Sequence, residues 1–133
     1  MAITGHCQCG SITYSIEGDL LGQVVCHCDH CQRQSGGAFS VNLVVHESQF
    51  TVTGEMAVFE DRGEHDDGVY VLRKFCGSCG SPIVSELMEP AGILAVKAGT
   101  LDDKSVVAPG AQYWTSHQQA WVDLAGLPAN ETE

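Results

Sequence analysis

The sequence predicts an all-β fold built from short antiparallel strands and hairpins, with at most short helical turns. Several short runs alternate apolar and polar residues, which is the period-two pattern of half-buried strands. Glycine-bearing turns separate these runs at close spacing, as in all-β domains. A chain of 133 residues, 44% of them apolar, can bury the core of one such domain without disulfide staples.

The first third of the chain combines strands with cysteine-containing turns. Alternation predicts a strand over residues 11–17, directly after Cys9-Gly10. A short strand at residues 24–25 then leads into a segment that is dense in cysteine. Residues 29–34 lack alternation and predict one helical turn, which the glycines of residues 35–37 would end.

Strands continue through the middle of the chain. Alternation and composition predict them at residues 39–45, 50–53, 56–59, 69–75, 82–87 and 93–98. The acidic run over residues 60–68 is expected to be a solvated hairpin loop between two of these strands. A turn that carries Pro90 and Gly92 predicts that the last two strands form a hairpin.

The last third of the sequence is less regular. Residues 117–124 predict one short helix that packs Trp121 and Leu124 on the sheet. Trp114 and Trp121 are expected in the core rather than at a ligand, because aromatic side chains carry large apolar areas. The domain is expected to span residues 1–127, with residues 128–133 as a frayed tail.

Charge and composition disfavour several classes of partner. Six basic residues against seventeen acidic residues give a net charge of −11, and such a surface repels the phosphates of nucleic acids. No basic segment followed by an apolar run begins the chain, and no run approaches the roughly 18 apolar residues of a membrane span. We therefore expect no nucleic acid or membrane partner, and a cytoplasmic location. Seven cysteines, an odd number, then favour metal binding or catalysis over disulfides.

The cysteines fall in three clusters with metal-ligand spacing: Cys7 and Cys9, then Cys26, Cys28 and Cys31, then Cys76 and Cys79. A structural zinc site uses four ligands, whereas a catalytic site keeps one position open. The last pair must therefore borrow two ligands, and spacing alone permits either the first pair or two members of the central triplet. Borrowing the first pair is more economical, because the triplet then stays together around a second ion.

A zinc ion on the triplet would keep its fourth position open for an outside ligand. Three thiolates donate heavily and weaken the metal as a polariser of water or carbonyls. Such a site favours a thiol substrate, whose pKa zinc would lower below the free value of about 8.5. The partner electrophile would be a carbonyl, and the product a hemithioacetal.

The chain resembles the glutathione-dependent formaldehyde-activating enzyme family, which includes the centromere protein V domain. The resemblance rests on residues 5–10, 26–36, 75–82 and 98–102, and on Trp121 and Leu127-Pro128. It implies a zinc-containing β-tent with a structural zinc on Cys7, Cys9, Cys76 and Cys79 and a catalytic zinc on Cys26, Cys28 and Cys31. It also implies a carbon–sulfur lyase, the S-(hydroxymethyl)glutathione synthase reaction, which joins formaldehyde to glutathione.

Basic residues are scarce, although glutathione is anionic. Arg33 directly follows the triplet and is the expected contact for the thiol substrate. Three further cations on predicted strands are expected to be surface residues, namely Arg73, Lys74 and Lys97.

Two histidines inside the triplet leave alternatives open. His27 and His30 could orient a ligand, relay a proton or replace a thiolate, or they could point outward from alternate positions of the loop. An alternative function is also open. Under this alternative, the chain is a non-catalytic zinc-binding module that binds a protein or peptide partner, and only the four-thiolate site matters to folding.

Overall fold

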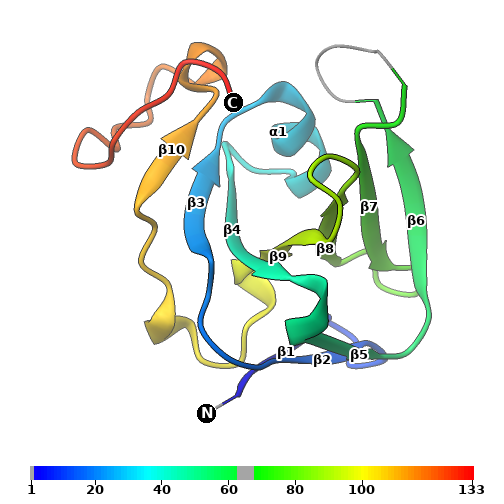
Figure 1. Cartoon of the computed structure of the whole chain (residues 1–133). Coiled ribbons are helices and arrows are strands. Elements are labelled where there is room, and N and C mark those ends of the chain that lie inside the picture. The colour runs from blue at the N-terminus through cyan, green and yellow to red at the C-terminus, as the bar shows by residue number, and fades with distance from the viewer. Residues whose placement is uncertain (1, 63–67) are drawn as a thin grey trace.

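Two β-sheets make up most of the computed structural model, which describes residues 2–62 and 68–133 (Figure 1). The smaller sheet has the order β1-β2-β5, with β1 at Ile3–His6, β2 at Thr13–Ile16 and β5 at Phe50–Thr53. The larger sheet has the order β10-β3-β4-β9-β8-β7-β6. Its strands are β3 Gly22–Cys26, β4 Ser40–His46, β6 Met56–Asp61, β7 Val71–Cys76, β8 Pro82–Leu87, β9 Ile93–Lys97 and β10 Ala111–Tyr113. The predicted all-β class is confirmed.

Helices are short, as predicted. The α-helix α1 spans Asp29–Ser35, and Gly36 ends it in the left-handed conformation with φ of 74°. Single 3₁₀ turns occupy Glu47–Gln49, Ala98–Thr100, Lys104–Val106 and Thr115–His117. Within the described residues, no helix is long and apolar enough to cross a membrane.

Most neighbouring strands are antiparallel, including the predicted hairpin of β8 and β9. The pair β10 and β3 is parallel, which differs from the antiparallel arrangement that we expected. Parallel neighbours need a crossover connection. Here a long irregular segment after β9 carries the chain to the far edge of the sheet, beside β3.

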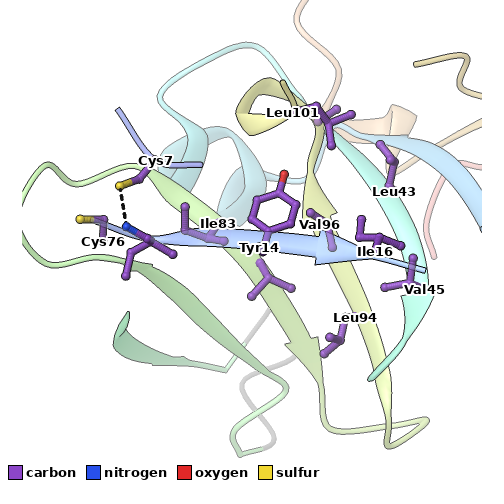
Figure 2. Packing of buried hydrophobic residues seen from close by; sticks show 13 residues of the cluster. Cys7, Tyr14, Ile16, Leu43, Val45, Cys76, Ile83, Leu94, Val96 and Leu101 are labelled. Atoms are coloured by element: carbon purple, nitrogen blue, oxygen red, sulfur yellow. Dashed lines mark hydrogen bonds between the residues drawn. The ribbon is translucent and has the colours of Figure 1, made fainter. Parts of the chain in front are cut away.

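The apolar core lies between the two sheets (Figure 2). Alternation in β2 places Ile12, Tyr14 and Ile16 in this core, as the sequence predicts. Leu43 and Val45 of β4 join them from the larger sheet. At one end of the cluster in Figure 2 lie two cysteines, Cys7 and Cys76, so the core continues directly into a group of sulfur atoms.

The opposite face of the larger sheet is also covered. Asn42, Arg73, Ser85 and Lys97 all come from this sheet and are buried, although polar residues were expected to face solvent. In Figure 1, β3 and β4 lie to one side and β6 and β7 to the other, with α1 above and between them. The side chains of Asn42, Arg73, Ser85 and Lys97 all line a cavity on this face of the sheet, which the sequence pattern predicts to be exposed to solvent.

The predicted helix at residues 117–124 is wrong. The segment is irregular, and Trp121 is 74% exposed instead of packing on the sheet. A side chain from α1 occupies a carbonyl that the helix would use, since Gln32 Nε2 donates to the His117 carbonyl at 2.9 Å. Gln118 Nε2 in turn donates to the Val122 carbonyl at 2.7 Å. Val122 is the buried side chain of this segment. Tertiary hydrogen bonds have overridden local propensity.

The end of the chain is hydrogen-bonded, where the sequence predicted fraying. The amide of Gln112 donates to the Pro128 carbonyl at 2.9 Å, and the amide of Asn130 donates to the Gln112 carbonyl at 3.0 Å. The amide of Trp114 donates to the Thr132 carbonyl at 3.1 Å. These bonds place the last residues alongside β10.

The acidic run at residues 60–68 is described in part, since residues 63–67 lie outside the described residues. Its hairpin position is confirmed, since β6 pairs with β7. The expectation that the whole run is solvated is wrong for Asp61, which lies in β6 and is 5% exposed. Arg73 of β7 forms an ion pair with this carboxylate, which accounts for its burial.

Candidate functional site

Four cysteines from two distant turns meet at one end of the core. Cys7 and Cys9 come from the turn between β1 and β2, Cys76 is the last residue of β7, and Cys79 lies in the turn between β7 and β8. Their sulfur atoms all lie within 4.8 Å of one another. The Sγ atoms of Cys7 and Cys9 are 3.6 Å apart, and those of Cys9 and Cys76 are 3.8 Å apart. The grouping that ligand counting favoured is therefore present.

The two turns present their sulfurs in similar ways. In each, a glycine with φ of 82° follows the second cysteine, at Gly10 and at Gly80. The Gly10 amide donates to the Cys7 carbonyl at 3.1 Å, and the Gly80 amide donates to the Cys76 carbonyl at 2.8 Å. A residue with a Cβ rarely adopts this positive φ, so glycine allows each turn to fold tightly around its sulfur pair.

This cluster fits a tetrahedral zinc ion. Zinc–sulfur bonds of about 2.3 Å in a tetrahedron place sulfurs about 3.8 Å apart, close to the two separations above. Backbone amides also donate to the sulfurs: Ile12 to Cys7 at 3.3 Å, and Cys79 to Cys76 at 3.4 Å. A hydrogen bond from the Ser81 hydroxyl lowers the pKa of Cys79 to about 5. Such donors favour the thiolate form that metal binding requires.

The remaining three cysteines form a second cluster at the start of α1. Cys26 ends β3, Cys28 is the N-cap of the helix, and Cys31 lies in its first turn. Their sulfurs are within 4.8 Å of one another. The Cys31 amide donates to the Cys28 sulfur at 3.2 Å, so this sulfur takes the place of the usual oxygen cap. Three sulfurs could hold a zinc ion and leave one position open.

A cavity of about 200 Å³ adjoins the triplet. Alternate residues of several strands line it, as the pleat of a sheet requires. For example, β9 contributes Ile93, Ala95 and Lys97. The C-terminal segment contributes further lining residues, namely Tyr113, Trp114 and Glu133. The three cysteines thus line a partly open cavity whose wall also contains apolar and charged side chains, and we call it the thiol cavity.

Two cations that were expected at the surface line the thiol cavity instead. Arg73 is 6% exposed and Lys97 is 7% exposed. Lys74, the neighbour of Arg73 in β7, instead pairs with Glu86 at 2.8 Å and is partly exposed. A signal was present in the sequence, because period two places Lys97 on the same strand face as the apolar residues Ile93 and Ala95.

Arg73 is held from several sides. Its Nε atom donates to the Asp61 carboxylate at 3.0 Å, and its Nη1 atom donates to the Ser85 hydroxyl at 3.1 Å. The same Nη1 atom lies 3.9 Å from the Cys31 sulfur. The Nζ atom of Lys97 donates to the Asn42 side-chain oxygen at 2.8 Å.

The pKa values of the triplet cysteines shift in different directions. Hydrogen bonds from the Cys26 and Cys28 thiols lower the pKa of Cys31, and the charges of Lys97 and Arg73 lower it further. The hydrogen bonds of Cys28 with its two sulfur neighbours raise its pKa. Cys31 is therefore the first of the three to carry negative charge, on the side where the cations lie.

The two histidines of the triplet have different surroundings. His27 is fully buried, its Nε2 atom lies 2.9 Å from the Gln112 side-chain oxygen, and its ring packs edge-on against Phe39. The outward orientation is therefore wrong for His27, which braces the site without lining the thiol cavity. The Nδ1 atom of His30 lies 2.8 Å from Asp61, so this residue joins α1 to the ion pair of Arg73.

Arg33 lies away from the triplet cavity. It is exposed on α1 and lines a second cavity of about 520 Å³, together with His30, Gln34, Phe59, Asp61, Arg73, Phe75 and Gly80. The two cavities share Arg73. Arg33 and Arg73 thus line the same cavity, which is larger than the thiol cavity.

Comparisons with known proteins bear on the whole chain. No curated protein gives a significant match. A crystal structure of a Rhodobacter sphaeroides protein, solved in a structural genomics programme, has a TM-score of 0.59 and 15% identity, and the match covers 95% of this chain and 98% of that one. This likeness shows a shared fold. Residues 2–117 match the family described as glutathione-dependent formaldehyde-activating enzyme, and they include all seven cysteines. The chain belongs to the glutathione-dependent formaldehyde-activating enzyme family.

Proposed function

We propose that the protein is a zinc-dependent carbon–sulfur lyase of the S-(hydroxymethyl)glutathione synthase type. It would join formaldehyde, or another small aldehyde, to the thiol of glutathione or a similar compound. The observation that carries the proposal is the meeting of three sulfurs, and not four, at the wall of a cavity of about 200 Å³. Family membership supports the formaldehyde-activating chemistry.

The two cysteine clusters receive different roles in this proposal. Cys7, Cys9, Cys76 and Cys79 hold a structural zinc ion, because four sulfurs complete the coordination of the metal. Cys26, Cys28 and Cys31 hold the catalytic ion, which is open to the thiol cavity. When bound there, zinc supplies a lowered pKa for a substrate thiol, which then stays a thiolate at neutral pH. Seven unpaired cysteines suit a reducing compartment, so we also propose a cytoplasmic location.

The size of the thiol cavity supports a small electrophile. A volume of about 200 Å³ is below the roughly 300–1,000 Å³ of pockets that enclose drug-sized ligands. The cavity suits an aldehyde together with the sulfur end of the thiol, whereas the rest of a tripeptide would lie outside. We propose that Arg33, in the larger cavity beyond Arg73, receives a carboxylate of that outer part.

The reaction needs little from the protein beyond positioning and charge. An electron pair of the thiolate sulfur forms a bond to the carbonyl carbon, and the π pair of the carbonyl moves to its oxygen. That oxygen gains one proton, which balances the proton that the thiol lost. Arg73 lies beside the Cys31 sulfur and adds positive charge where negative charge gathers. Asp61 and Ser85 hold the guanidinium in this orientation.

The test is NMR exchange spectroscopy on formaldehyde and glutathione. We expect zinc-loaded protein to accelerate their interconversion, and the variants Cys28→Ala and Cys28→Ser to lose this acceleration. Serine is a good N-cap, so Cys28→Ser keeps the start of α1 while it removes one thiolate. Zinc content should fall from two ions to one in both variants.

The control is Lys74→Met, because Lys74 pairs with Glu86 away from both cavities and the variant should stay active. A fully active Cys28→Ser protein would remove the triplet from the mechanism. Equal exchange in every sample, including one without protein, would remove glutathione and formaldehyde as the substrates.

A further inference from the structure

Lys97 is a buried cation that makes a single side-chain hydrogen bond among the described residues. Lysine is almost never fully buried unless it is paired. The Nζ atom of Lys97 donates to Asn42 at 2.8 Å, and within the described residues it has no second hydrogen bond and no ion pair. An ammonium carries three donors, so two of them have no partner among these residues.

The other cations of this region are compensated. Arg73 has the Asp61 carboxylate, the Ser85 hydroxyl and the Cys31 sulfur around it. Lys74 has Glu86 and is partly exposed. Lys97 therefore makes fewer hydrogen bonds than Arg73 and is less exposed than Lys74, and a buried charge with spare donors in a cavity is typical of a functional group.

The position of the ammonium is fixed by the sheet. Asn42 of β4 lies directly opposite Lys97 of β9 in the strand register. Asn42 itself is held, since its Nδ2 atom donates to the Ser40 hydroxyl at 3.0 Å. The Lys97 side chain lines the thiol cavity, whose wall also contains the three sulfurs of the triplet. The spare donors thus belong to a group that is pinned beside the space where a thiol would react.

We propose that the Lys97 ammonium binds the aldehyde oxygen, and then the hydroxyl oxygen of the hemithioacetal that forms. This inference rests on the proposed function and names the residue that receives the second substrate. The sulfur of the first substrate goes to the triplet, so the aldehyde must bind through its oxygen, its hydrogen-bond acceptor. As the C–S bond forms, the carbonyl π pair moves to this oxygen, and a nearby positive charge stabilises it there more than in the free aldehyde. The proton that completes the hydroxyl comes from solvent and replaces the one that the thiol released.

A simpler role must be separated from this one. Lys97 could serve only as a counterion for the charged sulfurs, since its charge also favours the thiolate of Cys31. A counterion would strengthen the binding of every thiol equally. A group that binds oxygen would favour a thiol that carries a hydroxyl over a thiol of the same shape without one.

The experiment is calorimetric titration of zinc-loaded protein with 2-mercaptoethanol and with 1-propanethiol, which replaces the hydroxyl by a methyl group. We expect Lys97→Met to weaken binding of 2-mercaptoethanol by about tenfold, the usual effect of a hydrogen bond to a charged group. Binding of 1-propanethiol should change by less than about twofold, since it forms no such hydrogen bond. The control Lys74→Met should bind both thiols as the wild type does.

A second variant, Lys97→Arg, keeps the test decisive if Lys97→Met does not fold. Lys97→Arg keeps a cation with several donors and should keep the preference for 2-mercaptoethanol, whether or not Lys97→Met folds. Equal losses for both thiols, or a Lys97→Arg protein without the preference, would overturn the role of Lys97 and leave the proposed function intact. The expected binding pattern without accelerated exchange in NMR would support Lys97 and reject the proposed reaction. A wild-type protein that binds neither thiol would reject both.

Discussion

Two buried cations beside the triplet illustrate how single side chains set the chemistry of the thiol cavity. Arg73 forms an ion pair with Asp61, which also contacts His30, so these three residues join α1, β6 and β7. Lys97 has no such partner within the described residues, and burial lowers its pKa to about 8. The neighbouring sulfurs, Cys31 first, oppose this shift. The cavity therefore keeps a cation that costs folding free energy.

This cost predicts how stability depends on pH. The pKa of Lys97 is about 8 in the folded protein against 10.5 for an ordinary lysine, so the unfolded chain binds more protons between these values. Relative to Lys97→Met, the free energy of unfolding of the wild type should rise with pH across this window, by up to about 3 kcal/mol. Below pH 8 the difference should be constant. Urea denaturation of both zinc-loaded proteins at several pH values measures it, and a difference that does not vary with pH would contradict the shift.

Arg33 should affect the affinity for the thiol and leave the chemistry alone. It is exposed in the larger cavity, where a contact with a carboxylate is screened by solvent and contributes about 0.2–1 kcal/mol. Arg33→Ala should therefore raise the KM for glutathione roughly twofold to fivefold without a change in kcat. A neutral thiol should be unaffected. Exchange rates measured at varied thiol concentration decide this, with the exposed Lys104→Ala as the control. An unchanged KM would remove Arg33 from substrate binding.

Among the elements, α1 depends most directly on the cysteines. A helix of seven residues is too short to be stable alone, so caps and tertiary contacts must hold it. The Cys28 sulfur caps its start, and the left-handed Gly36 ends it. Gln32, which is partly buried, joins the helix to residues near the C-terminus, because its Nε2 atom donates to the His117 carbonyl at 2.9 Å. The geometry of the triplet is thus built into the start of the helix.

The small sheet has its own critical position. Gly5 of β1 lies opposite Tyr14 of β2, and a Cβ at Gly5 would lie 2.6 Å from the Thr100 carbonyl oxygen and also against the Tyr14 ring. Gly5→Ala should displace Tyr14 from its hydrogen bond with Thr100 and cost at least about 2 kcal/mol of unfolding free energy. Gly99→Ala is the matched control, because a Cβ there meets open space. Chemical denaturation of the two variants measures this, and equal stabilities would show that the small sheet yields to the added methyl group.

For the whole molecule, what could be predicted from the sequence depends on how local the signal is. The two sulfur clusters could be predicted because ligand spacing and a count of seven cysteines leave few arrangements. The strands that carry Tyr14 and Leu94 follow from period-two patterns. The burial of Asp61 could not be predicted, because it depends on a partner twelve residues away. The irregular segment around Trp121 is held by hydrogen bonds between Gln32 of α1 and residues 117 and 119. Non-local contacts, which a linear pattern does not contain, decide these cases.

The four-sulfur site should matter far more to the fold than the triplet does. It joins the turn of the small sheet at Cys7 and Cys9 to the turn of the large sheet at Cys76 and Cys79, at one end of the shared core. Structural zinc contributes about 10–16 kcal/mol in zinc-finger peptides, which equals or exceeds the whole stability of a typical domain. Loss of this ion should therefore unfold the protein.

Stepwise chelation followed by calorimetry tests this order. The first equivalent of zinc should leave from the triplet, which supplies only three ligands. Its loss should lower the melting temperature by only about a few degrees. Removal of the second equivalent should abolish the cooperative transition. Cys28→Ser should have the same melting temperature as the protein that has lost one ion. Cys76→Ser should fail to fold at a zinc concentration that is sufficient for the wild type to fold. A metal-free protein that still melts cooperatively at the wild-type temperature would show that the two sheets hold each other through the apolar core alone, and that the four sulfurs serve another purpose.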